Sequence, residues 1–274
     1  VLQHVPLPEL AHDILQQLDF RGQLRNTRLR WTPGLPWQQQ LEYDTNILGL
    51  DYSPWEDVPG ATGISGRLFG SLAGGELHLD SDGFSLYLRE LFATPWQYHK
   101  AKARLTWELA ENLDFTLASP YLQVSGDEGE LAGDFVIHLP TTKGREPYMD
   151  LRVGMRDGDA SHKARYLPLI LRDDQPELWS WLHEAIQGGD VHQGYFQYQG
   201  SLAAKAPASA RSISLYFDVS EARLAYQPGW PVLEHGRAQV FVHDDGVEIE
   251  IERGRILQTG IRDAHAEVRY SKET

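Results

Sequence analysis

The sequence predicts a mostly β protein, built around a long antiparallel sheet that carries two short helices. Three observations lead to this fold class. Apolar and polar residues alternate along most of the chain, glycine-containing turn sequences separate the alternating segments, and only two segments carry apolar residues at helical spacing. Strict alternation is typical of antiparallel strands that have one apolar face and one solvated face.

The alternating segments extend through both halves of the chain. Asp82-Gly83, Gly126-Asp127 and Asp245-Gly246 lie between such segments and predict hairpin turns, because each pair can supply a positive φ angle. The clearest predicted hairpin joins Gln239–His243 to Val247–Ile251.

The most regular helical pattern covers residues 176–187. Pro176 suits the first helical position, where its missing N–H costs nothing. Gly188-Gly189 is expected to end the helix, because glycine adopts the left-handed conformation without steric cost. The apolar residues on one face of this segment are Leu178, Trp181, Leu182, Ala185 and Ile186. A second short helix is predicted over Pro8–Leu18, before the first strand.

The chain is acidic and lacks cysteine. It has 25 Lys and Arg against 39 Asp and Glu, a net charge of −14, which argues against nucleic acid and against electrostatic docking on an anionic lipid surface. The absence of cysteine excludes disulfides and thiolate metal sites. No run of about 20 apolar residues occurs, and the chain opens without methionine. We therefore expect a piece of a longer protein, with any membrane anchor outside it.

Residues with catalytic or metal-binding chemistry form no recognisable motif. The 11 histidines are scattered. Asp157-Gly158-Asp159 lacks the later ligands of a calcium loop and predicts a surface turn, while Gly63–Gly66 is followed by Arg67 where a nucleophile elbow needs glycine. The alternating glutamates of one predicted strand form its solvated face: Glu248, Glu250 and Glu252. We expect no enzyme activity, no cofactor and no metal.

Eight tryptophans allow the interpretation of a carbohydrate-stacking surface, but a structural role is favoured for half of them. Trp181 belongs to the apolar face of the predicted helix. Trp107 shares an alternating face with Leu105 and Leu109, and could line either a core or a groove. Three more stand beside proline at corners between groups of strands: Trp55, Trp96 and Trp230.

The segment Arg165–Leu202 resembles the YhdP branch of the AsmA-like family, through the pattern YLP…LxxWLxxAIxGGxVxxGxFxYxGxL. Pro228–Pro231 (PGWP) is similar to a strand-ending motif of that family, and Pro59–Gly66 and Gly75–Ser81 also fit. The resemblance covers most of the chain, and none of its motifs is catalytic or cofactor-binding.

The resemblance implies a particular architecture. Alternation alone leaves open whether a second sheet, a closed barrel or nothing covers the apolar face. In the family that the chain resembles, the sheet curls into an open groove whose inner face stays apolar. We expect two repeat units, residues 1–164 with the N-terminal helix and residues 165–274, which open with the helix over residues 176–187.

The resemblance also implies a function. The chain would be a periplasmic segment of a protein anchored in the inner membrane of a Gram-negative bacterium. It would carry phospholipid towards the outer membrane and support the permeability barrier of that membrane. The expected partners are phospholipid acyl chains and adjoining segments of the same longer chain, with membrane contact through parts outside this fragment. The alternative is a non-catalytic β-sandwich module that binds a partner protein or a polysaccharide.

The lining of the expected groove is predicted from strand faces, not from a family motif. The expected lining residues are Leu86, Leu105, Trp107, Phe115, Phe135, Ile137, Leu215, Phe217, Val240, Val242, Ile249 and Ile251.

Overall fold

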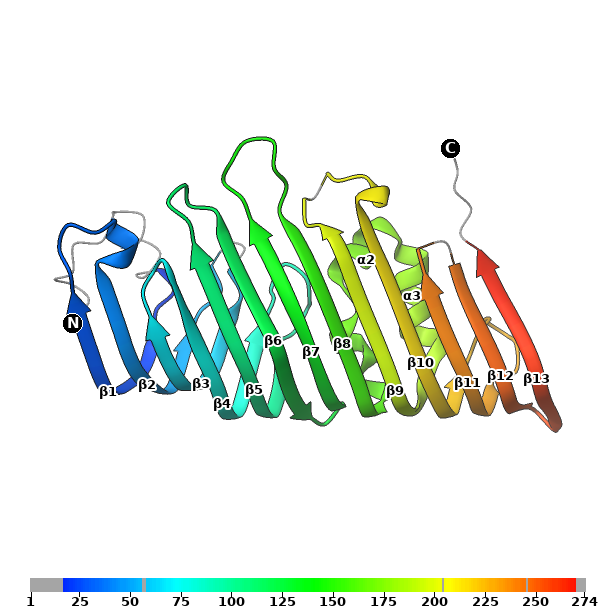
Figure 1. Cartoon of the computed structure of the whole chain (residues 1–274). Coiled ribbons are helices and arrows are strands. Elements are labelled where there is room, and N and C mark those ends of the chain that lie inside the picture. Colours follow the sequence, from blue (N-terminus) through cyan, green and yellow to red (C-terminus); the bar gives the residue numbers. More distant parts are fainter. Residues whose placement is uncertain (1–16, 56–57, 204, 245, 270–274) are drawn as a thin grey trace.

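The computed structural model describes residues 17–55, 58–203, 205–244 and 246–269 (Figure 1). The helix predicted over Pro8–Leu18 lies outside this part of the chain except for its last two positions. Within the described residues no helix is both long enough and apolar enough to cross a membrane.

In the described part of the chain, thirteen strands form one sheet in which every strand pairs antiparallel with its neighbours in sequence. Figure 1 shows these strands side by side in a long row. The mostly β prediction is confirmed, and no second sheet forms a sandwich in the described residues. The strands are β1 (Arg21–Trp31), β2 (Leu41–Tyr52), β3 (Gly60–Gly70), β4 (Gly74–Tyr87), β5 (Trp96–Leu109), β6 (Phe115–Gly126), β7 (Gly129–Leu139), β8 (Tyr148–Asp159), β9 (Ile186–Ser201), β10 (Arg211–Leu224), β11 (Leu233–His243), β12 (Gly246–Ile256) and β13 (Thr259–Arg269).

The sheet is continuous across the predicted boundary between residues 164 and 165, because β8 and β9 pair along their length. The division into two repeat units therefore stays a prediction.

The helices differ from the prediction in number and in length. Pro176 does begin a helix, α3 (Pro176–Ala185), but the helix ends two residues before the predicted glycines. Gly188 instead pairs with Arg223 of β10, because β9 already begins at Ile186. A further helix, α2 (Leu169–Asp174), precedes α3, and the described residues also contain three short 3-10 helices: η2 (Trp37–Gln39), η3 (Ala160–Tyr166) and η4 (Ala208–Ala210).

Two hairpins agree with the sequence and one does not. Gly126 pairs with Gly129 in the β6–β7 hairpin, and His243 pairs with Gly246 in the β11–β12 hairpin, whose Asp245 lies outside the described residues. Asp82-Gly83 is no hairpin turn, since both residues lie inside β4. Asp157-Gly158-Asp159 likewise belongs to the end of β8 and is not a surface turn between elements.

Bulges bend several of the strands. Register shifts accompany residues with positive φ at Asn26 (54°) in β1, Gly49 (55°) in β2, Gly63 (75°) in β3, Glu221 (48°) in β10 and His235 (52°) in β11. A bulge bends its strand and increases the local right-handed twist. Bulges in successive strands therefore curl the sheet along its length.

The segment from Ala160 to Ala185, here called the helical insert, contains η3, α2 and α3 and lies on one face of the sheet, behind β9 and β10 in Figure 1. At one side it meets the beginning of β5. The indole N–H of Trp96 donates to the Arg165 carbonyl at 2.9 Å, and the Leu169 amide donates to the Leu91 carbonyl at 2.8 Å.

The other side of the helical insert meets the end of β10. The Trp181 indole N–H donates to the Tyr226 carbonyl at 3.0 Å, and the Ala225 amide donates to the Ala185 carbonyl at 2.8 Å. The insert therefore spans the strands between β5 and β10, all on one face of the sheet.

A buried carboxylate also contacts the insert. Glu128, in the β6–β7 turn, is 1% exposed. Its carboxylate accepts a hydrogen bond from the Tyr166 hydroxyl at 2.7 Å and forms an ion pair with Arg165 at 3.3 Å. The Tyr166 hydroxyl also lies 3.3 Å from that of Tyr98 in β5. Burial, together with these neighbours, raises the pKa of Tyr166, which keeps the hydroxyl protonated as a donor.

Candidate functional site

The candidate site is the face of the sheet on which the helical insert packs, here called the inner face. Cross-strand register places eleven of the twelve predicted lining residues on it. Leu105 and Trp107 lie opposite Leu77 and Gly75, and the indole of Trp107 occupies the space beside Gly75, where a Cβ would come within 2.4 Å of the ring. The Trp107 N–H donates to the Ser71 carbonyl at 3.1 Å.

The same face continues through the middle strands. Phe115 pairs with Leu139, while Phe135 and Ile137 pair with Leu151 and Met149 of β8. In the next strands Phe217 lies over Gly194, where a Cβ would come within 3.0 Å of its ring. The remaining predicted lining residues are placed on the inner face by direct cross-strand pairs: Leu215 with Val242, Phe217 with Val240, Val240 with Ile249, and Ala238 with Ile251.

Leu86 reaches the inner face through a local irregularity. Strict alternation from Leu79 would place it on the opposite face. Two consecutive exposed residues in each strand, Asp82-Gly83 in β4 and His99-Lys100 in β5, shift the alternation by one position. Phe84 and Leu86 consequently pack against the buried cluster that contains Leu79.

The twelve residues share one degree of burial. Each is partly buried, neither enclosed nor fully exposed. They differ in this from the closely packed inner-face residues of β2–β5, which are Ile47, Ala61, Ile64, Leu79, Ala101 and Ala103, all at most 9% exposed.

Several residues of the inner face were not among the predicted twelve. Leu151, Val153 and Met155 of β8 join Phe135, Gly133 and Leu131 across the strands, and β9 adds Phe196 and Tyr198. Both sets alternate in the sequence, so the signal that identified the other strands was present here as well.

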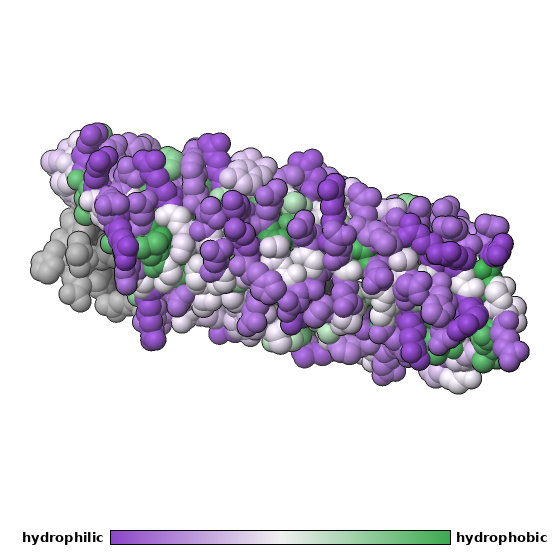
Figure 2. All heavy atoms as spheres, turned by 90° about the horizontal axis from the view of Figure 1, so that it is seen from below, coloured by the Kyte–Doolittle hydropathy of each residue, from purple (hydrophilic) through white to green (hydrophobic). Residues whose placement is uncertain are grey.

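The opposite face, here called the outer face, is dominated by charged side chains in pairs. Arg104 binds Glu76 at 2.6 Å, and Arg152 binds Asp134 at 2.6 Å. Hydrogen bonds from Arg104 and then His78 lower the pKa of Glu76 to about 2. The glutamates of β12 also face outward, since Glu248 pairs with Phe241 while its neighbour Ile249 pairs with Val240. Figure 2 shows the underside of the molecule as a largely hydrophilic surface with small separate apolar spots.

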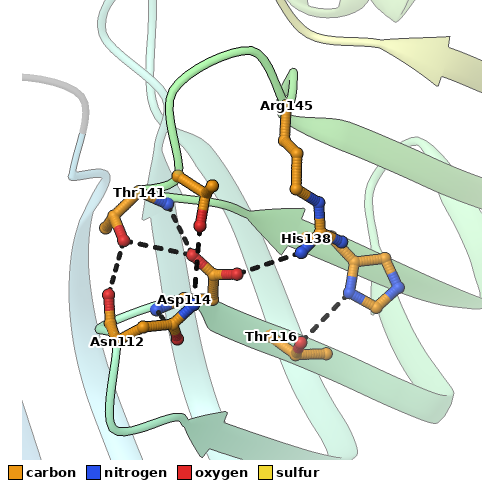
Figure 3. Close-up of polar contacts among 7 residues, drawn as sticks. Asn112, Asp114, Thr116, His138, Thr141 and Arg145 are labelled. Atoms are coloured by element: carbon orange, nitrogen blue, oxygen red, sulfur yellow. Dashed lines mark hydrogen bonds and ion pairs between the residues drawn. The ribbon is translucent and has the colours of Figure 1, made fainter.

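A polar network joins two connecting loops at one rim of the sheet (Figure 3). Asp114 accepts hydrogen bonds from the Thr141 amide at 2.7 Å and from Arg145 at 3.1 Å, and the Thr141 hydroxyl donates to the Asn112 carbonyl at 2.6 Å. The Thr141 amide is the main cause of the lowered pKa of Asp114. These contacts join the β5–β6 loop to the β7–β8 loop, and the arrangement resembles no catalytic constellation.

No group of three or more His, Cys, Asp or Glu side chains in the described residues is arranged to hold a metal ion. A hollow of about 1070 Å³ is lined mostly by outer-face residues of β5–β11, and five inner-face residues also border it: Leu131, Val153, Met155, Phe196 and Leu215.

Comparison with known proteins identifies a matching family and a relative of this chain. The family described as YhdP protein matches residues 1–272. The chain is 27% identical over 232 residues to the intermembrane phospholipid transporter YhdP of Escherichia coli strain K12; the match covers 82% of this chain and 18% of that protein. No solved structure matches the chain. Since the family match extends over almost every residue and the sheet carries the expected strand pattern, the chain belongs to the YhdP family.

Proposed function

We propose that this chain is a periplasmic segment of a phospholipid carrier, and that acyl chains move along the inner face of its curled sheet. The observation that carries the proposal is the position and exposure of the predicted lining. Twelve apolar side chains occupy one face of a single sheet, and none is enclosed as a core residue would be. Membership of a family with a relative named as an intermembrane phospholipid transporter supports it.

The chemistry of the inner face suits an acyl chain. Removing one methylene from water is worth about 0.8 kcal/mol, so a tail of roughly sixteen carbons cannot cross water without a cost of about 13 kcal/mol. Apolar side chains without directional hydrogen bonds hold such a tail at many equivalent positions. Movement then needs no bond to be made or broken, and we propose that the chain acts without catalysis.

The path would run across the strands, not along them. Neighbouring strands are about 4.8 Å apart, so thirteen strands cover roughly 60 Å. Direct cross-strand contacts connect the lining without a break from β8 to β12: Met155, Gly194, Phe217, Val240 and Ile249 follow one another in register. The lipid headgroup would remain in water beyond the rim.

The two edge strands suggest how the path continues in a longer protein. β1 and β13 each pair with only one strand in the described residues, which leaves backbone N–H and C=O groups able to accept another strand. The chain spans 18% of the length of the E. coli relative. We propose that adjoining segments of the same longer chain extend the sheet at these edges, that parts outside this fragment anchor it in the inner membrane, and that delivery to the outer membrane supports its permeability barrier.

The test compares adjacent residues on opposite faces of β7. The chain is purified without detergent, extracted with organic solvent and examined by native mass spectrometry. We expect the parent chain to carry phospholipid. Phe135→Asp should lose most of the bound lipid, because a carboxylate would then stand in the acyl path. Phe217→Asp and Ile249→Asp should act in the same way on other strands.

Val136→Asp is the matched control. Val136 is the neighbour of Phe135 in the chain and is also partly buried, but it pairs with Ala118 and Asp150 on the outer face. It should retain lipid at the parent level. Circular dichroism establishes that each variant is folded. A folded Phe135→Asp chain that still carries lipid, or a parent chain that binds neither lipid nor a fluorescent acyl probe, would refute the proposal.

A further inference from the structure

Three aromatic side chains form a row on the otherwise charged outer face. Tyr195, Tyr216 and Phe241 come from three adjacent strands and are direct cross-strand partners. The ring centroids of Tyr195 and Tyr216 are 6.1 Å apart in a stacked arrangement, and those of Tyr216 and Phe241 are 5.0 Å apart. Tyr195 is 49% exposed. Large aromatic rings on a solvated face are not needed for a core, because the apolar residues of the same strands face inward.

The row lies in the outer-face hollow of about 1070 Å³. Gly154 of β8 is the cross-strand partner of Tyr195, and the ring lies beside this glycine, where a Cβ would come within 3.5 Å of it. Gln193 donates to the Tyr195 hydroxyl, which holds the ring in position. Amide groups of Gln197 and Gln123 also border the hollow and offer both donors and acceptors.

Cationic side chains outnumber carboxylates among the residues that line the hollow, although the chain is strongly negative. Four cationic side chains, Lys100, Lys102, Arg152 and Arg156, line it against two carboxylates, Glu130 and Asp134, in a chain with a net charge of −14. Three of the four cations are paired with carboxylates: Arg152 with Asp134 at 2.6 Å, Lys102 with Asp80 at 3.6 Å and Lys100 with Asp82 at 3.9 Å. Arg156 is exposed and forms no ion pair with the described residues, and it is one strand away from Tyr195. A free guanidinium beside an exposed aromatic row favours a ligand with both an anionic group and an apolar ring face.

We propose that this hollow binds an anionic saccharide. The C–H face of a sugar ring packs on the electron-rich face of an aromatic ring. The glutamine amides match ring hydroxyls, and Arg156 provides the two parallel N–H groups that a carboxylate or phosphate accepts. The aromatic row and Arg156 lie on the outer face, whereas the twelve residues predicted to line the lipid path lie on the inner face of the sheet.

The experiment is a calorimetric titration of the folded chain with three probes. The first is tetragalacturonate, which has sugar rings and carboxylates; the second is maltotetraose, which has rings without charge; the third is a tetraglutamate peptide, which has charge without rings. Tetragalacturonate should bind, and the other two should bind at least tenfold more weakly. Tyr195→Ala should weaken tetragalacturonate binding about three- to tenfold, and Arg156→Ala about tenfold.

Two matched variants control for position. Tyr121 is an exposed tyrosine on the outer face of β6 outside the hollow, and Arg30 is an exposed arginine of β1. Tyr121→Ala and Arg30→Ala should bind as the parent does. Equal binding of the peptide would assign the hollow to an acidic protein partner, and equal binding of maltotetraose would remove the role of Arg156. Either result, or the absence of tetragalacturonate binding at millimolar concentration, overturns the proposal. Val136→Asp and Phe135→Asp should leave saccharide binding unchanged. The proposal of a saccharide site and the proposal of a lipid path can therefore be tested independently.

Discussion

The inner face of the sheet behaves differently in two regions that share one sequence pattern. In β2–β5 the inward residues include a cluster of buried side chains, such as Ala101 (0% exposed), Ala103 and Ile47, although Leu86, Leu105 and Trp107 on these strands stay partly exposed. From β6 to β12 the inward residues include Phe135, Phe217 and other large side chains that stay partly exposed. Small side chains on neighbouring strands can pack closely enough to bury one another.

This comparison shows that alternation in the sequence identifies which residues share one face of the sheet. It does not show whether that face is packed as a core or left partly exposed. Both regions alternate, yet the first contains the buried cluster, whereas most of the large apolar side chains of the second are only partly buried. Extended apolar surface on a water-exposed face is typical of binding sites. We therefore expect the buried cluster of the first region to contribute most to stability, and we propose that lipid contacts mainly the second region, which holds nine of the twelve predicted lining residues.

Truncation of the closed cluster should have the largest effect on stability. Ile47 is 3% exposed and packs within the cluster, so Ile47→Ala removes buried methyl groups and leaves a cavity. We expect the free energy of unfolding to fall by about 2–5 kcal/mol. Urea denaturation followed by circular dichroism measures this loss.

Phe217→Ala provides the contrast on the open part of the face. It removes a larger side chain, but one that is only partly buried, so its cost should stay below that of Ile47→Ala while acyl-probe binding weakens. If Phe217→Ala proved the more destabilising of the two, the second region would be a core and the comparison would be wrong.

The second effect concerns the helical insert, which extends from the start of β5 to the end of β10 and covers part of the inner face of the second region. Glu128→Ala removes the buried acceptor of Tyr166 and Arg165. Because Tyr166 would lose this acceptor and Arg165 its partner, we expect a loss of about 1–3 kcal/mol. Hydrogen exchange should rise in residues 160–185 more than in β11–β13.

Glu128→Gln tests whether the charge itself is needed, since the amide oxygen can still accept from Tyr166. It should be milder than Glu128→Ala. Unchanged exchange across residues 160–185 in Glu128→Ala would show that the insert is held by its other contacts, such as those of Trp96 and Trp181.

Much of this fold was predictable because its signals are local. The β11–β12 hairpin and the start of α3 at Pro176 follow from alternation and from the rigid φ angle of proline, and both are present. The errors come from contacts between distant residues. Helix α2 has only six residues, and its Leu169 amide donates a hydrogen bond to the Leu91 carbonyl. Because Leu91 is far away in the sequence, the local pattern of residues 169–174 could not predict this contact.

The glycines show the same limit. The local sequence around Gly188 predicts the end of a helix. In the structure Gly188 belongs to β9, because it pairs with Arg223 of β10. Gly83 reads as a turn, yet its positive φ of 74° forms a bulge beside Gly63, where a Cβ would come within 2.3 Å of the Gly83 carbonyl oxygen. For the candidate site, the sequence could select the residues of one face, but the division of that face into closed and open regions depends on how the strands bend.

The smallest predicted effect is an acid sensitivity of the outer face in the first region. Arg104 and His78 hold the pKa of Glu76 at about 2, below its ordinary value of 4.5. A carboxyl whose pKa is lowered in the folded state contributes stability above its unfolded pKa, and this contribution is lost as the pH falls through the folded value. Between about pH 4.5 and pH 2 the parent chain should therefore lose stability more steeply than Glu76→Gln, which has no carboxyl to protonate.

Urea midpoints measured at intervals across this window test the difference, with Glu250→Gln on the outer face of β12 as the control. Parallel pH profiles for the parent and Glu76→Gln would mean that this ion pair contributes nothing to the stability of the first region, which would then rest on its buried cluster alone.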